Sequence, residues 1–140
     1  MTENHFVIKP IGIIRSELTD LTDAPKQGIE GGSEAWLDVS PQVTPGLLGI
    51  KPGDKLIVLT WLHLAQRDTL QVHPRGRQEA PLKGVFATRS QDRPNPVGLH
   101  QVIVLEVVEQ KIKVAPIEAI DGTPLVDIKP VLSQEKRGSG

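Results

Sequence analysis

The chain has 140 residues, and its 16 lysines and arginines against 17 aspartates and glutamates give a net charge of −1. This length predicts one domain with a buried core, and the charge balance is not that of a dedicated nucleic-acid binder. The absence of cysteine excludes disulfides, thiolate metal sites and cysteine nucleophiles. No apolar run reaches the roughly 18 residues of a membrane helix, and the N-terminus lacks a signal-peptide pattern, so we expect a cytoplasmic protein.

Short apolar segments separated by turn residues follow one another along the chain. The 13 glycines and 12 prolines favour a fold of short strands over a helix bundle. We expect strands at residues 6–14, 34–39, 55–63, 83–88, 101–108, 111–117 and 125–128. Six or seven short strands of irregular spacing indicate an all-β barrel or sandwich with long loops.

The strongest strand signal lies at residues 55–63. Leu56, Val58, Thr60 and Leu62 alternate with Ile57, Leu59, Trp61 and His63. Both sets are mostly apolar, which predicts a strand covered on both faces.

The connections between strands are also partly predictable. Glu109-Gln110 separates two apolar runs that predict a hairpin, and residues 44–50 predict one helical turn. Pro10 and Gly12 indicate an edge or a bulge in the first strand. Residues 20–33 form a long polar loop, and residues 133–140 a disordered tail after a domain at residues 1–132.

One loop carries the most specific signal of the chain. Within residues 84–99 the sequence Arg-Pro-Asn-Pro occupies positions 93–96. Each proline fixes its own φ and biases the preceding residue to extended geometry. We expect a rigid loop, poor in hydrogen bonds, that presents Arg89, Arg93 and Asn95 to a ligand; plain turn chemistry is the alternative.

The same region is locally basic. Between residues 67 and 93 six basic residues face three acidic ones, a surplus of three. They are Arg67, Arg75, Arg77, Lys83, Arg89 and Arg93, against Asp68, Glu79 and Asp92. The stretch is either a solvated loop or a face that contacts a polyanion.

Three further places concentrate polar residues. Gln27 in the long loop offers a carbonyl and an amide, and His63 ends the strongest strand. Asp127 and Lys129 share one strand face, either as a surface ion pair or as part of a site. The four histidines lack metal-ligand spacing, so we predict no metal site, and the common phosphate-binding and nucleophile-elbow motifs are absent.

Taken together, the motifs match one family. Five segments stand in the same order as in the TsaA/TrmO (UPF0066-type) tRNA methyltransferases. They are Ile-Gly-Ile-Ile-Arg-Ser at 11–16, Pro-Lys-Gln at 25–27, and residues 84–90, 93–99 and 121–130. The chain resembles a short form of this family, without the additional C-terminal domain of larger members. The resemblance implies a homodimeric β-barrel that binds S-adenosyl-L-methionine and methylates N6 of threonylcarbamoyl-adenosine beside the tRNA anticodon.

The resemblance also implies which residues carry the function. The implied cofactor contacts are Pro25, Lys26, Gln27, His63, Leu64, Arg89, Leu99, Ala115, Pro116, Ile117 and Glu118. Methyl transfer from a sulfonium needs positioning rather than a protein nucleophile. Asp127, Asp121 and His63 are the open alternatives for the base that removes the acceptor proton. We place Arg93, Asn95 and Lys129 on the RNA side.

The sequence departs from the family pattern at several positions. Val131 stands where a tyrosine is usual, and Leu64 where a glutamine is common. Glu118 replaces an aspartate, and His100 follows Leu99 where a serine is common. These departures leave two alternatives open: a methyltransferase on another RNA base or a small molecule, and a non-catalytic barrel that binds RNA or a nucleotide.

Overall fold

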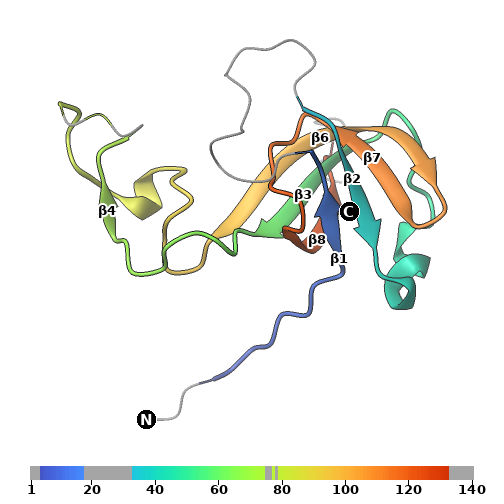
Figure 1. The fold of residues 1–140 in the computed structure, drawn as a ribbon, viewed down its shortest axis with the longest axis horizontal. Coiled ribbons are helices and arrows are strands. Elements are labelled where there is room, and N and C mark those ends of the chain that lie inside the picture. Colours follow the sequence, from blue (N-terminus) through green and yellow to red (C-terminus); the bar gives the residue numbers. More distant parts are fainter. Residues whose placement is uncertain (1–3, 18–32, 75–76, 78, 133–140) are drawn as a thin grey trace.

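The computed structural model describes residues 4–17, 33–74, 77 and 79–132. Six antiparallel strands close into a barrel in the order β1-β2-β7-β6-β3-β8 (Figure 1). These strands are β1 (Gly12–Arg15), β2 (Ala35–Val39), β3 (Lys55–Trp61), β6 (Val97–Val108), β7 (Lys111–Ala115) and β8 (Pro124–Pro130). The predicted all-β class is confirmed, and closure leaves the sheet without an open edge.

Side chains along each strand alternate between the barrel interior and the outer face, and the inward-facing ones form the core. On β3, Leu56, Val58 and Thr60 are buried, whereas Ile57, Leu59 and Trp61 on the outer face are only half-buried. The predicted two faces of this strand are therefore confirmed, but the outer face is less covered than expected. The other core residues include Ile14, Leu37, Val102, Val104, Ile112, Val114, Ile117 and Leu125.

Two of the predicted strands are much shorter than expected. β1 begins only at Gly12, because residues 6–10 pair with no other strand. A Cβ at Gly12 would lie 2.2 Å from the Asp38 carbonyl oxygen, so close pairing with β2 requires glycine there. The segment predicted at 83–88 is a strand only at β5 (Lys83–Gly84) and then turns into the 3-10 helix η4 (Val85–Ala87).

Two other predicted strands are longer. β6 begins at Val97, four residues before the predicted start, because the Arg-Pro-Asn-Pro segment ends just where pairing with β3 begins. β8 extends to both flanking prolines. β7 instead stops at Ala115, before a cis Ala115–Pro116 bond.

The predicted connections are largely confirmed. β6 and β7 pair up to Val108 and Lys111 around Glu109-Gln110, and Glu109 has a φ of 55°. The helical turn predicted at 44–50 is the 3-10 helix η2 (Pro41–Leu47). The loop at 20–32 and the tail at 133–140 lie outside the described residues. Among the described residues no helix has the length and hydropathy to cross a bilayer.

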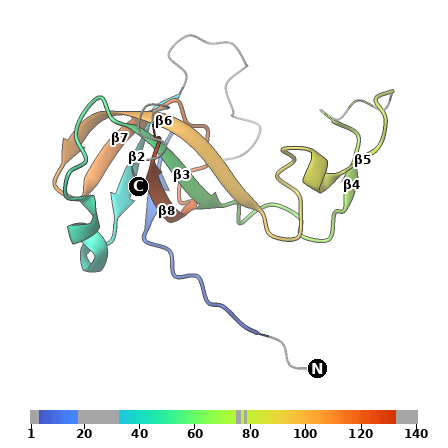
Figure 2. The same cartoon turned by 180° about the vertical axis from the view of Figure 1, so that it is seen from behind.

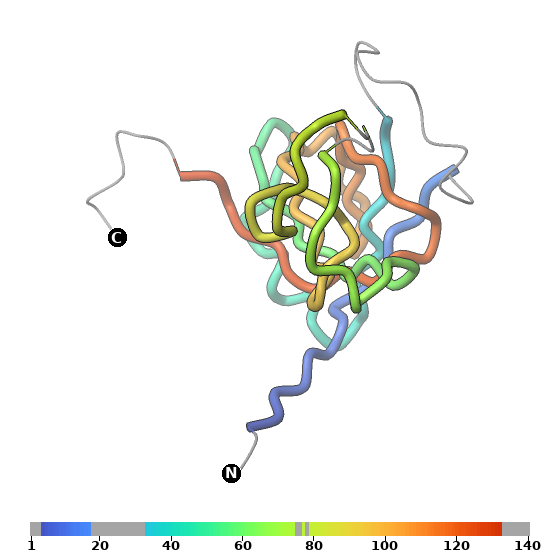
Figure 3. The backbone as a smooth tube through the Cα atoms, turned by 90° about the vertical axis from the view of Figure 1, so that its left-hand side faces the viewer, coloured from blue at the N-terminus to red at the C-terminus, as the bar shows by residue number. Residues whose placement is uncertain are grey.

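An arm, residues 62–96, projects from the barrel between β3 and β6 (Figures 1 and 2). Its tip is a small sheet of β4 (Gln71–Val72) and β5, and β4 was not predicted. Its neck continues the barrel ladder, because the Leu62 N–H donates to the Pro96 carbonyl at 2.8 Å. Figure 3, seen from the arm side, shows the arm in front of one barrel end.

Candidate functional site

The topology gathers most of the predicted site residues at one end of the barrel. Because neighbouring strands are antiparallel, the last residues of β1, β3 and β7 meet the first residues of β2, β6 and β8. His63 and Leu64 follow β3, and Leu99 is the third residue of β6. Ala115 ends β7, and residues 116–118 follow it. The arm that carries Arg89 leaves from this same end (Figure 1).

A cavity of about 680 Å³ lies where the arm meets this end. Its lining is Leu62, Arg89, Ser90, Gln91, Arg93, Val97, Gly98, Leu99 and His100. We call it the Arg89 cavity. Two of the predicted cofactor positions, Arg89 and Leu99, therefore line the same cavity, and Arg89 makes no ion pair or hydrogen bond with the described residues.

A tight polar contact forms the floor of the Arg89 cavity. Thr60, fully buried on β3, lies 3.1 Å from His100 through its Oγ1 and the imidazole Nε2. Gly98 sits beside both, and a Cβ there would lie 2.4 Å from Thr60 Oγ1. Burial lowers the pKa of His100, so the imidazole is neutral at pH 7. Sequence reasoning noted His100 only as a departure and did not place it in the site.

Arg93 braces the loop from within. Its Nε donates to the Ser90 carbonyl at 2.7 Å, and its Nη2 donates to the carbonyls of Val85 and Thr88 at 2.7 and 2.6 Å. A planar guanidinium is suited to such a fork of acceptors. The contacts give Arg93 a structural task that the sequence did not predict; its contact with RNA stays a prediction.

The loop is therefore not poor in hydrogen bonds, and that part of the prediction is wrong. Side chains replace the backbone donors that proline removes. The Gln66 N–H donates to Asp92 Oδ1 at 2.8 Å. Arg67 donates through Nε to the Pro94 carbonyl at 2.6 Å and through Nη2 to Asn95 Oδ1 at 2.9 Å. Arg67 lay in the basic stretch, but nothing in its sequence context indicated this clamp.

The remaining cofactor positions lie at this end without lining the Arg89 cavity. His63 and Leu64 are exposed just beyond β3. Ala115 and Ile117 turn their side chains into the core, whereas Pro116 and Glu118 are exposed. The Ile117 N–H donates to the Ser33 carbonyl at 2.9 Å, next to the segment that precedes β2. Pro25, Lys26 and Gln27 in that segment lie outside the described residues.

The three candidate bases are not brought together. Asp121 accepts the Ser16 N–H at 3.0 Å in the turn before β8, at the same barrel end as exposed His63. Asp127 sits in the middle of β8 on the outer face, opposite Leu59. It forms the predicted ion pair with Lys129, at 3.6 Å. No group of three possible metal ligands occurs among the described side chains.

Comparison with known proteins assigns the family. Residues 13–135 match the model of the tRNA-methyltransferase O N-terminal domain. The chain belongs to the TrmO N-terminal domain family. It is 40% identical over 130 residues to a probable S-adenosyl-L-methionine-binding protein of Methanothermobacter thermautotrophicus, covering 93% of each chain. It is 41% identical over 123 residues to an S-adenosyl-L-methionine-binding protein of Archaeoglobus fulgidus, covering 88% of this chain and 87% of the relative.

Solved structures agree with this family. A crystal structure of TrmO from Pseudomonas aeruginosa matches with a TM-score of 0.73 and 27% identity over 94% of this chain. The chain spans only 56% of that TrmO chain. Another TrmO crystal structure matches with a TM-score of 0.74, and the chain covers 57% of it. The likeness thus extends over the barrel and the arm described here, but over only part of the TrmO chain.

Proposed function

We propose that this chain is an S-adenosyl-L-methionine-dependent methyltransferase that acts on tRNA in the cytoplasm. Its proposed product is the N6-methyl form of threonylcarbamoyl-adenosine beside the anticodon. The observation that carries the proposal is the Arg89 cavity, built from two motifs of a TrmO family chain at one barrel end. Relatives that match nearly the whole chain are named as S-adenosyl-L-methionine-binding proteins, which supports the same cofactor here.

The cavity fits this cofactor chemically. A volume of about 680 Å³ is within the range of small-molecule sites. Arg89, which has no partner among the described residues, suits the carboxylate of the amino-acid part. Leu62 and Leu99 supply apolar walls, and the exposed carboxylate of Glu118 at the same end suits the ribose hydroxyls. Neutral His100 adds no positive charge near a sulfonium.

The protein contributes mainly by positioning. When bound, the cofactor supplies an activated methyl group, so the chain needs no nucleophile of its own. Arg93 and Arg67 fix the loop on either side of Pro94, which keeps Arg89 and Leu99 beside the same cavity. A preformed wall reduces the entropy lost when a donor and an acceptor are aligned.

We further propose that two copies form a homodimer through the outer face of β6. Ile103 and Leu105 are 43% and 42% exposed on this face, beyond the residues of β6 that line the two cavities. Residues two apart on a strand share one face, and exposed apolar side chains gathered in this way are typical of protein interfaces.

Mass spectrometry of tRNA nucleosides after incubation with enzyme and cofactor tests the reaction. Loss of threonylcarbamoyl-adenosine and gain of its methylated form is the expected result. Arg89→Ala should lower cofactor affinity by more than tenfold in calorimetry, whereas Lys83→Ala, an exposed cation on the same arm, should not. Cofactor binding without any change in threonylcarbamoyl-adenosine would instead favour another RNA base or a small molecule as acceptor. Absence of cofactor binding would favour the non-catalytic barrel.

A further inference from the structure

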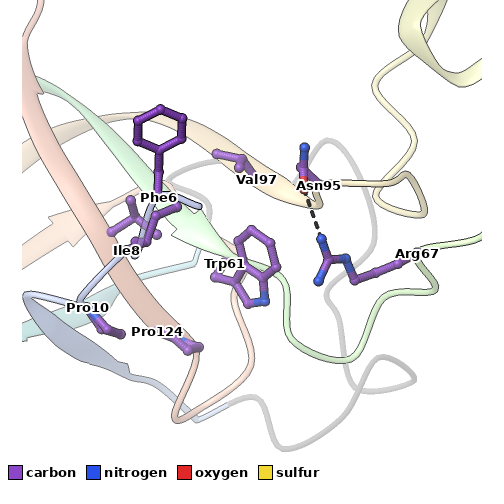
Figure 4. A pocket seen from close by; sticks show the side chains of 9 residues that line it. Phe6, Ile8, Pro10, Trp61, Arg67, Asn95, Val97 and Pro124 are labelled. Atoms are coloured by element: carbon purple, nitrogen blue, oxygen red, sulfur yellow. Dashed lines mark hydrogen bonds between the residues drawn. The ribbon is translucent and has the colours of Figure 1, made fainter. Parts of the chain in front are cut away.

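A second cavity lies on the outside of the barrel, and the cofactor proposal above does not use it. It measures about 620 Å³ and is lined by Phe6, Ile8, Pro10, Trp61, Arg67, Asn95, Val97, Pro124 and Val126 (Figure 4). We call it the Trp61 cavity. Its inner wall is the end of β3, β6 and β8, and its outer wall is the extended segment before β1.

The walls of the Trp61 cavity suit a flat apolar ligand. Figure 4 shows the Trp61 indole on one side and Phe6, Ile8 and Val97 on the other. Phe6 is 86% exposed and Ile8 is 54% exposed, so packing within the chain leaves more than half of each residue accessible to a ligand. Aromatic side chains on both sides of a slot are the usual device for stacking an unpaired base.

The two polar side chains of this cavity, Arg67 and Asn95, present hydrogen-bond donors to a ligand. Arg67 lies over the Trp61 ring at 5.0 Å and donates to Asn95 Oδ1. A guanidinium has no acceptor, so this bond fixes the amide with its oxygen toward Arg67 and its NH₂ group away from it. That NH₂ group has no partner among the described residues, and Arg67 has no carboxylate partner there. A ligand must therefore bring acceptors and a negative charge.

We propose that the Trp61 cavity holds the methyl-accepting purine nucleotide, and this inference rests on the proposed function. The base stacks between Trp61 and Phe6, an acceptor on its edge meets the Asn95 NH₂ group, and an anionic group beside it meets Arg67. Val97, the first residue of β6, lines both this cavity and the Arg89 cavity, so the methyl donor and its acceptor adjoin at this side chain.

The two tryptophans of the chain allow a direct test. In a Trp36→Phe background Trp61 is the only fluorophore, and adenosine 5′-monophosphate should quench it saturably. Adenosine should bind more weakly, and ribose 5-phosphate should not quench. The titration is run with S-adenosylhomocysteine at saturation, so that the donor site is filled. Trp36 is the matched control, because it also has a cation over its ring, Lys113 at 5.9 Å. In a Trp61→Phe background the nucleotide should leave the emission of Trp36 unchanged.

Variants separate the roles of the two polar residues. Asn95→Asp keeps the shape and the Arg67 contact but removes the donor, and should weaken nucleotide binding by about tenfold. Arg67→Ala should abolish the preference for the monophosphate over adenosine. Both residues are exposed, so the fold should persist, which thermal melting checks.

Three results would overturn the inference. They are a quench that is not saturable, equal affinity in Asn95→Asp, and Trp61 emission that depends on protein concentration alone, which would mean that a second copy fills the cavity. Failure of the proposed function looks different. In that case S-adenosylhomocysteine gives no thermal shift, whereas the quench by the monophosphate persists.

Discussion

Gly98→Ala tests whether the floor of the Arg89 cavity is as tightly packed as the distances indicate. The new Cβ would lie 2.4 Å from Thr60 Oγ1 and 3.1 Å from both His100 Nε2 and Leu62 Cδ2. Thr60 is fully buried and β-branched, so it cannot turn away without giving up its contact with His100.

The expected loss of stability follows from three terms. Overpacking costs about 1–3 kcal/mol, and the weakened Thr60–His100 contact costs about 1 kcal/mol. Replacing glycine stabilises by about 0.4–1 kcal/mol through the unfolded chain. The net loss is about 2 kcal/mol, which corresponds to a urea midpoint about 1 M lower at a slope of about 2 kcal/mol/M.

Urea denaturation followed by circular dichroism measures this loss, with two controls. Gly46→Ala meets nothing within 4 Å and should stay within about 0.5 kcal/mol of the wild type. Adding Thr60→Ala to Gly98→Ala removes the contacting oxygen, so the double variant should be more stable than the two separate losses predict. A Gly98→Ala protein as stable as the wild type, or strictly additive losses, would refute the packing argument.

The other predictions concern the loop, a buried imidazole and the outer face of the barrel. Arg93→Lys keeps the charge but cannot serve three carbonyls, so amides at 85–93 should exchange with solvent at least tenfold faster, with Lys83→Ala as the unaffected control; equal protection would contradict the brace. The pKa of His100 in the folded protein lies below its unfolded value of about 6.5. Its contribution to the free energy of unfolding is therefore complete above pH 6.5 and is lost as the pH falls from there toward the folded pKa. His100→Gln should therefore flatten the stability profile below pH 6.5, and a difference between the two proteins that does not vary with pH would reject this. Leu105→Glu should convert a dimer into a monomer in light scattering, whereas Val43→Glu, at a residue of similar exposure on η2, should not; a dimer that survives Leu105→Glu would exclude the β6 face.

Strands were predictable where the alternation of apolar side chains determines them. They were less predictable where the presence or absence of a neighbouring strand sets their ends. The alternation at 55–61 placed β3 and divided its side chains between two faces correctly, but it did not show which face lies inside the barrel. Residues 6–10 have the same β-branched composition as a strand, but no neighbouring strand remains for them to pair with. Pro94 and Pro96 indicated a loop, so the sequence did not predict the early start of β6. Strand pairing with β3 nevertheless begins at Val97, directly after Pro96.

The candidate site was predictable from motifs but not from local chemistry. Arg89 and Leu99 come together because the arm returns to the barrel at the start of β6, a consequence of strand order. The tasks of Arg93 and Arg67 depend on carbonyls that are brought within reach by the fold. His100 depends on Thr60, which is 40 positions away.

The way the arm leaves the barrel makes its tip a separable module. The arm joins β3 at residue 62 and β6 at residue 96, and the bonds of the neck at Gln66, Arg67 and Arg93 hold the base of the arm in place. Residues beyond this neck make no pairing with the closed sheet. A graft that exchanges residues 71–84 between relatives would therefore leave the closed sheet and its core intact.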